Sequence, residues 1–192
     1  DSSELAHNWA RLAQHFDSLF TTQSSIDALK QTILQLAVMG KLVPQDPNDE
    51  PASVLLERIA AEKARLVKEG KIKKEKPLPP ISEEEKPFVL PDGWEWCRLG
   101  KIINLISGQH LKPDEYSESE LPQGIPYITG PAEFGEVYPT YSKYTLEKRA
   151  VANVGDILVT CKGAGLGKLN VTNTSMAISR QLMAIEPIIF DN

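Results

Sequence analysis

A glycine-rich segment with two lysines is the part of this sequence whose residue types and spacing suggest chemistry. Within residues 155–172, a hydrophobic stretch is followed by a loop in which three glycines separate two lysines: Lys162, Gly163, Gly165, Gly167 and Lys168. Glycines let a backbone approach a ligand closely, and lysines supply positive charge for an anion. The segment predicts a strand, an anion-binding loop and a second strand. The anion is either a nucleotide's phosphates or a nucleic-acid backbone.

The spacing of this loop matches neither common nucleotide-binding motif. A P-loop has a glycine, four further residues and then Gly-Lys followed by Ser or Thr. Here Leu169 follows Lys168, and Lys162 stands where the first glycine belongs. A dinucleotide fingerprint needs a helix after its third glycine, whereas residues 169–174 are β-branched and turn-like. A plain hairpin with solvated lysines stays open as an alternative.

The sequence offers no catalytic constellation. Asp156 and Lys162 bracket the predicted strand, but Thr160 stands where a nuclease would be expected to carry a metal-binding carboxylate. Asp156 is better explained as stabilising the turn into the strand. The three histidines are isolated, and there is no Gly-x-Ser-x-Gly nucleophile elbow. We therefore predict that the chain performs no chemistry itself and is not an enzyme.

Length and composition are those of an ordinary globular protein. The 192 residues, 41% of them hydrophobic and 24% charged, suffice for one sizeable core or two small ones. No apolar run approaches the roughly 20 residues that span a bilayer, and the first residues lack signal-peptide features. Cys97 and Cys161 lie far apart without metal-ligand spacing, which favours thiols in a reducing compartment over a disulfide. We expect a cytoplasmic protein.

Charge is distributed unevenly along the chain. The net charge of −5 argues against indiscriminate coating of nucleic acid. Residues 88–142 carry three basic and eight acidic side chains, whereas residues 143–180 carry six basic and two acidic ones. A locally basic segment in an acidic protein suggests a bounded anion-binding face, and ordinary scatter of surface charge is the alternative.

The first 70 residues have helical periodicity. Apolar residues recur at helical spacing in three stretches, around 5–20, 25–40 and 52–68, with Ser25 as a cap of the second and Gly40 at its end. The second and third helices are predicted to form a helical hairpin. Residues 71–87 mix a charged run with prolines and form an extended linker, for which contact with nucleic acid is the less favoured interpretation.

Residues 88–192 form a second, β-rich domain, so the fold class is α+β. Short β-like runs punctuated by Gly, Pro, Asn and Asp predict strands at 95–99, 102–106, 125–129, 156–160, 169–172 and 181–185. A short helix is predicted at 145–152.

Three stretches together resemble the specificity subunits of type I restriction–modification systems. They are residues 25–46, residues 90–100 (Leu-Pro-Asp-Gly-Trp-Glu-Trp-Cys-Arg-Leu-Gly), and the 155–168 hairpin followed by 177–183. The resemblance covers most of the chain, and the first two stretches are its more specific part. It implies an N-terminal helical conserved or spacer region at 1–70 and an α/β target recognition domain at 88–192. Because a complete domain of that kind is longer, we expect the chain to be truncated, an N-terminal fragment.

The resemblance also implies a function and partners. A specificity subunit is a noncatalytic, sequence-specific reader of one half of a bipartite site in double-stranded DNA, and it directs restriction and adenine methylation. Its helices dock methyltransferase subunits, through which restriction (motor) subunits join. No cofactor is expected in this chain, because S-adenosylmethionine, ATP and Mg²⁺ belong to the partner subunits. Such systems are bacterial or archaeal.

Residue roles follow from that resemblance. Lys162 and Lys168 are expected to contact phosphates or base edges, with Gly163, Gly165 and Gly167 permitting the approach. Further DNA contacts are assigned to base-reading and backbone-positioning residues: Arg180 and Gln181 for the first role, and Lys143, Lys148 and Arg149 for the second. The apolar residues expected to pack helix on helix or against the methyltransferase subunit are Ile26, Leu29, Ile33 and Leu36.

Two other functions stay open at this point. One is a helical interaction or assembly module without DNA binding, which the apolar helices and acidic net charge favour. The other is a nucleotide-binding enzyme, which requires ATP to protect the 162–168 loop. A salt bridge is the alternative role for Arg180.

Overall fold

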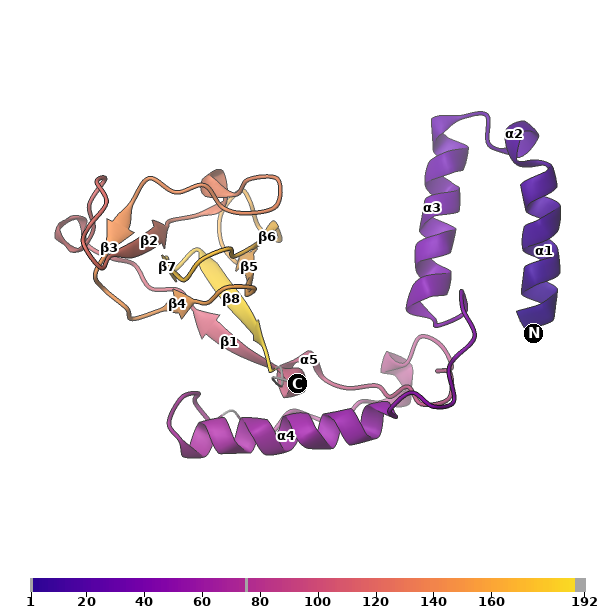
Figure 1. Cartoon of the computed structure of the whole chain (residues 1–192), viewed down its shortest axis with the longest axis horizontal. Helices are drawn as coiled ribbons and strands as arrows, with labels where there is room; N and C mark the ends of the chain where they lie inside the picture. Colours follow the sequence, from indigo (N-terminus) through magenta and orange to yellow (C-terminus); the bar gives the residue numbers. More distant parts are fainter. Residues whose placement is uncertain (1, 75, 189–192) are drawn as a thin grey trace. The chain divides into compact units, whose positions relative to one another are not determined.

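The computed structural model describes residues 2–74 and 76–188, which divide into two compact units (Figure 1). One unit comprises the residues up to Arg58 together with Pro79–Cys97, and the other comprises Ile59–Leu78 together with the residues from Arg98 on. Residue 75 of the predicted linker and residues 189–192 of the predicted second domain lie outside the described residues. The predicted domain boundaries stay a prediction.

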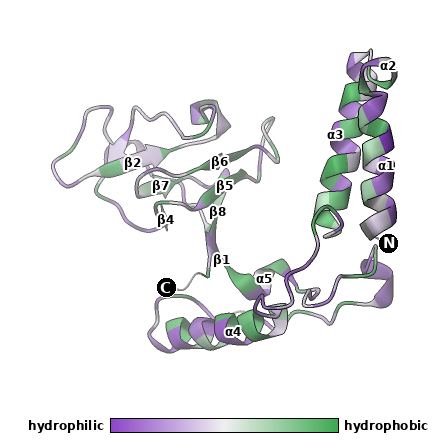
Figure 2. Ribbon diagram, turned by 45° about the vertical axis from the view of Figure 1, so that its right-hand side comes forward, coloured by the Kyte–Doolittle hydropathy of each residue, from purple (hydrophilic) through white to green (hydrophobic). Residues whose placement is uncertain are grey.

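The first unit contains the N-terminal helices. These are α1 (Ser2–Gln14), α2 (Phe16–Leu19) and α3 (Gln23–Val38), together with the first part of α4 (Ala52–Lys68) and the 3₁₀ turn η1 (Glu83–Glu85). Helices α1 and α3 lie side by side, and hydrophobic residues recur along both (Figure 2). Since α4 crosses the boundary between the units, the predicted pairing of 25–40 with 52–68 stays a prediction.

The N-cap of helix α3 lies three residues before the predicted cap. Thr22 is the N-cap residue and accepts the Ser25 backbone N–H, while the Ser25 hydroxyl accepts the Thr22 N–H in a reciprocal capping box. The prediction of Ser25 as the cap is therefore wrong, although Ser25 is the other member of the same capping box. Gly40 follows the helix with a φ of 66°, the left-handed conformation that glycine adopts without strain.

The second unit is built on two four-stranded sheets. The strands are β1 (Ile103–Ser107), β2 (Ile125–Ile128), β3 (Tyr144–Thr145), β4 (Val151–Ala152), β5 (Ile157–Thr160), β6 (Leu169–Val171), β7 (Met176–Ile178) and β8 (Leu182–Pro187), with α5 (Leu99–Ile102), η2 (Pro113–Glu115) and η3 (Pro131–Glu133) between them. The strand orders are β1-β8-β5-β6 and β3-β2-β7-β4. With helices and strands in separate stretches of chain, the α+β class is confirmed.

The core of this unit joins the two sheets. One cluster combines Leu158, Leu182 and Ala184 of the first sheet with Ile128, Met176 and Ile178 of the second. All six are at most 1% exposed. On the other face of the second sheet, Tyr127 packs with Leu111 and Ala177. The two sheets are therefore held by apolar contacts from strands far apart in sequence, which fixes the loops between them.

Two predicted elements are wrong, and three strands, β3, β4 and β7, were missed. Residues 145–152 form no helix: β3 pairs with β2, β4 pairs with β7, and the chain between them turns. The strand predicted at 95–99 does not form: Trp94 donates a hydrogen bond to Gln45, the Trp96 ring packs on Phe88, and Leu99 begins α5. Strand β7 is buried at every position and so lacks the alternation that marks a half-exposed strand.

Candidate nucleic-acid interface

Strand directions bring several loops to one end of the first sheet. β8 is antiparallel to both β1 and β5, so its start lies beside the ends of those two strands. Residues 108–110, 161–168 and 179–181 follow or precede these strand ends, and we call them together the loop end. In the second sheet β2 runs parallel to β7, so residues 129–131 follow β2 beside the start of 179–181.

Backbone hydrogen bonds join the segments of the loop end. The Cys161 N–H donates to the Gln181 carbonyl at 2.8 Å, and the Gln109 N–H donates to the Ile178 carbonyl at 2.9 Å. The Ser179 hydroxyl donates to the Thr129 carbonyl. The loops therefore form one connected surface, although up to about 70 residues separate them in sequence.

Two glycines make this close packing possible. A Cβ on Gly108 would lie 2.0 Å from the Ser179 carbonyl oxygen, a distance that real Cβ atoms do not reach. A Cβ on Gly165 would lie 2.5 Å from Cγ of Pro131. Any side chain at either position would push the neighbouring segment away, so glycine is required at both positions for the loops to approach this closely.

The glycine-rich loop itself is held by local hydrogen bonds. The Gly167 N–H donates to the Thr160 carbonyl at 2.9 Å, the Lys168 N–H to Gly165 at 3.0 Å, and the Leu166 N–H to Gly163 at 3.2 Å. Gly163 and Gly167 have φ values of 89° and 81°, which favour glycine. Gly163 and Gly167 are thus needed for their left-handed backbone conformation, and Gly165 for its close contact with Pro131.

The basic residues of the loop end are exposed. Lys162, Lys168 and Arg180 all lie on the surface, and within the described ranges 2–74 and 76–188 none of the three forms an ion pair. Gln181 is exposed as well, and its side chain lies over Gly130, where a Cβ would be 2.6 Å from Gln181 Oε1. Three cations without partners on one connected surface form a site suited to a polyanion.

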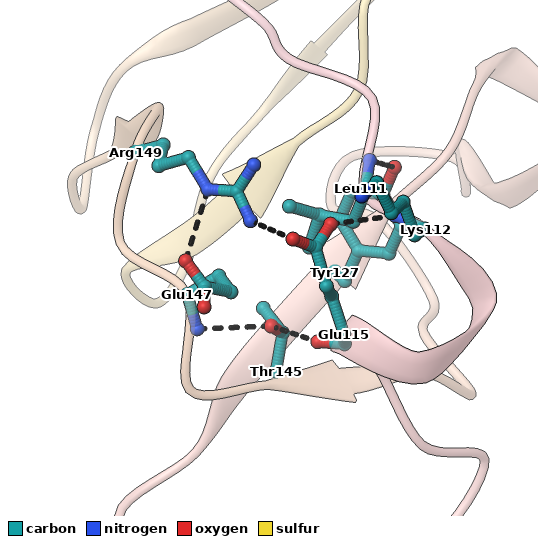
Figure 3. A network of polar contacts seen from close by, with 7 residues as sticks. All are labelled: Leu111, Lys112, Glu115, Tyr127, Thr145, Glu147 and Arg149. Atoms are coloured by element: carbon teal, nitrogen blue, oxygen red, sulfur yellow. Dashed lines mark hydrogen bonds and ion pairs between the residues drawn. The ribbon is translucent and has the colours of Figure 1, made fainter.

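Arg149 has different surroundings (Figure 3). Its guanidinium donates to Glu115 and, at 2.9 Å, to Glu147. These bonds raise the pKa of Arg149, and the Lys112 backbone N–H together with Arg149 lowers the pKa of Glu115. The Thr145 hydroxyl donates to the Glu115 carbonyl at 2.6 Å. Two carboxylates therefore balance the charge of Arg149.

The predicted DNA-binding set thus falls into two groups. Lys162, Lys168, Arg180 and Gln181 come together at the loop end. Lys143, Lys148 and Arg149 lie around β3 and β4 of the second sheet, where Lys143 is half-buried and Lys148 exposed. Which of these residues contact DNA stays a prediction.

The residues predicted to bind a partner also separate. Leu29 and Leu36 line a groove of about 440 Å³ between α1 and α3, opposite Trp9 and Leu12. Ile26 is half-buried, and Ile33 is 36% exposed on a neighbouring face of α3. Docking of a partner on this helix stays a prediction.

Two exposed residues of the loop end escaped the sequence reasoning. Gln109 and His110 directly follow Gly108, whose backbone packs against Ser179 and Leu182. The signal in the sequence was a glycine after a predicted strand, but the role of that glycine depends on a contact with a turn about 70 residues further along the chain.

The described residues contain no candidate metal site: within residues 2–74 and 76–188, no three His, Cys, Asp or Glu side chains gather closely enough to hold an ion. None of the described helices has the length and apolarity to cross a membrane.

Comparison with known proteins identifies relatives of this chain. No protein-family model matches it. The specificity subunit of the Escherichia coli type I restriction enzyme EcoAI is 75% identical over 114 residues, which are 59% of this chain and 19% of that protein. The EcoEI specificity subunit from the same organism is 75% identical over 109 residues, covering 56% of this chain and 18% of the relative. The chain thus spans about a fifth of each relative's length.

A solved structure of an HsdS subunit from Thermoanaerobacter tengcongensis is also similar. It is 26% identical with a TM-score of 0.49, over 70% of this chain and 34% of that chain. A TM-score below 0.5 does not establish a common fold, so the relationship rests on sequence identity. At 75% identity over more than half of its length, the chain is homologous to the specificity subunits of type I restriction enzymes, and the resemblance seen in the sequence is confirmed.

Proposed function

We propose that this chain supplies part of a noncatalytic DNA-recognition subunit of a type I restriction–modification system. The observation that carries the proposal is the 75% identity to the EcoAI specificity subunit over 114 residues. The loop end supports it independently, because unpaired cations on connected loops are what a DNA backbone requires. In this role the chain performs no chemistry and reads one half of a bipartite site in double-stranded DNA.

The loop end divides the work of recognition between two kinds of contact. Lys162 and Lys168, on either side of the glycines, contact phosphates and fix the position of the protein on the duplex. Arg180 is exposed beside them and reaches a base edge, for which guanine is the best partner, while Gln181 supports the turn and suits adenine. Lys143 and Lys148 contribute weaker backbone contacts. Arg149 contributes least, because Glu115 and Glu147 already bind it.

The helical unit supplies the contact with partner subunits. Besides Ile33, the apolar side chains of Leu34 and Val38 are 56% and 63% exposed on α3. Large apolar side chains gathered on one helix are typical of a protein interface. Methyltransferase subunits bind there and link the motor subunits to the complex. S-adenosylmethionine, ATP and Mg²⁺ are held by those partner subunits.

Selection of DNA from a random-sequence duplex library tests the proposal. The full-length subunit, assembled with its methyltransferase subunits, is expected to enrich a bipartite sequence at moderate salt. Binding without any enrichment would contradict sequence recognition. ATP in place of DNA serves as the control ligand: calorimetric binding of ATP to the isolated chain would favour the nucleotide-binding alternative.

A further inference from the structure

The tip of the glycine-rich loop carries an apolar side chain that the proposed function does not yet use. Leu166 is 70% exposed, more than any other large hydrophobic residue among the described residues of the second unit. It lies outside both hydrophobic clusters of that unit. Single exposed leucines are common on protein surfaces, so the backbone and the neighbours of Leu166 decide whether this one has a role.

Contacts on both sides fix the backbone around Leu166. Its own N–H is bonded to Gly163, and the next residue is tied to strand β5 through the bond from the Gly167 N–H to Thr160. On the other side, Gly165 is packed against Pro131. Leu166 is therefore presented to solvent by a loop fixed on both sides, and presenting it costs little conformational entropy on binding.

The neighbours of Leu166 indicate what it meets. Lys162 and Lys168 flank the loop, both are exposed, and neither forms an ion pair in the described part of the chain. A protein surface that matched this tip would have to supply carboxylates around an apolar pocket. Duplex DNA supplies phosphates on both sides of a groove, with apolar thymine methyl groups on its floor. The second arrangement fits a leucine between two lysines.

We propose that Leu166 contacts thymine methyl groups in the major groove and so contributes to the sequence preference of the subunit. The inference rests on the proposed function, because it requires the loop end to face DNA. It adds a base-reading role for an apolar residue, in a loop to which only phosphate and polar base contacts had been assigned. The contact is independent of charge, which separates it experimentally from the lysines.

The test compares wild type with Leu166→Ala in the full subunit assembled with its methyltransferase subunits. Two duplexes are used: the sequence that the wild type selects, and the same sequence with every thymine replaced by uracil, which removes only the methyl groups. We expect Leu166→Ala to bind the selected duplex about tenfold more weakly. The slope of affinity against salt should not change, because no phosphate contact is lost.

The uracil duplex distinguishes a methyl contact from other effects. Wild type should lose about fourfold in affinity for each methyl group that Leu166 covers, and Leu166→Ala should lose less than wild type. Equal losses in the two proteins, or an unchanged affinity of Leu166→Ala for the selected duplex, would overturn the inference while leaving the proposed function intact. If wild type selects no sequence, the proposed function itself fails.

Leu146→Ala serves as the matched control. Leu146 is 59% exposed in the same unit but follows β3 in the second sheet. It should keep wild-type affinity on both duplexes. A tenfold loss in Leu146→Ala as well would show that removing any exposed leucine weakens the domain, and would count against a specific role for Leu166.

Discussion

Strand β5 is preceded by an acidic residue and followed by a basic one, and the two differ in whether the fold provides a bonding partner. Asp156, just before the strand, is 3% exposed and accepts the Asn153 N–H at 2.7 Å. Lys162, just after the strand, is exposed and has no ion-pair partner in the described residues. The Asp156 carboxylate is therefore occupied in stabilising a turn, whereas the Lys162 ammonium group is available to bind a ligand. A charge is a good binding candidate when the fold leaves it unsatisfied.

Removing the charge from the loop end should give the largest effect. We expect Lys162→Ala with Lys168→Ala to weaken DNA binding of the assembled complex about a hundredfold at physiological salt. The slope of log affinity against log salt should fall by about 2, because two phosphate contacts are lost. Fluorescence anisotropy over a salt series measures both quantities. An unchanged slope would mean that neither lysine contacts a phosphate.

Arg149→Ala is the matched control for that variant. It removes one positive charge from the same unit, but a charge that Glu115 and Glu147 already balance. DNA affinity should stay within about threefold of wild type, and the melting temperature should fall slightly. A loss as large as that of the lysine pair would break the distinction between paired and unpaired cations.

At the other end of β5, the expected effect is on stability and its pH dependence. Burial raises the pKa of Asp156 from 3.8 to about 6, although the bond from the Asn153 N–H opposes the shift. Because the folded protein binds this proton more tightly than the unfolded chain, stability from this group is greatest below pH 4 and is lost as pH rises towards 6.

Asp156→Asn tests this sign directly. Asparagine keeps an oxygen that can accept the Asn153 N–H but does not titrate. The free energy of unfolding of wild type, relative to that of the variant, should fall by on the order of 2 kcal/mol between pH 4 and pH 7. Urea denaturation at several pH values measures the difference. A difference that grows in favour of wild type over this range would show that the carboxylate is stabilised by its surroundings instead.

Local patterns in the sequence predicted much of the fold. Helical periodicity and flanking prolines located α4, and turn residues located β1, β5, β6 and β8 within one or two positions. The helix predicted at 145–152 failed because Ala150 and Ala152 are buried by packing against strands, which residue preferences do not reveal. Tertiary contacts override weak local propensity.

The site was predictable only in part, for the same reason. The glycine loop and its lysines are contiguous and could be identified by composition. Two other properties depend on residues far away in the sequence: Gly108 packs against Ser179, and Arg149 pairs with Glu115. Neither contact can be predicted from residues that are close in sequence. The sequence therefore indicated which residues are basic, and the fold decided which of them stay unpaired.

Cross-linking at the loop end tests the central claim most directly. A photoreactive p-azidophenylalanine replaces Lys162 in one protein and Arg149 in another, each assembled with its methyltransferase subunits and bound to the selected duplex. On irradiation, the residue at position 162 should cross-link to DNA, and the residue at position 149 should do so far less. Cross-linking from position 149 but none from position 162 would contradict the assignment of the loop end as the DNA-facing surface.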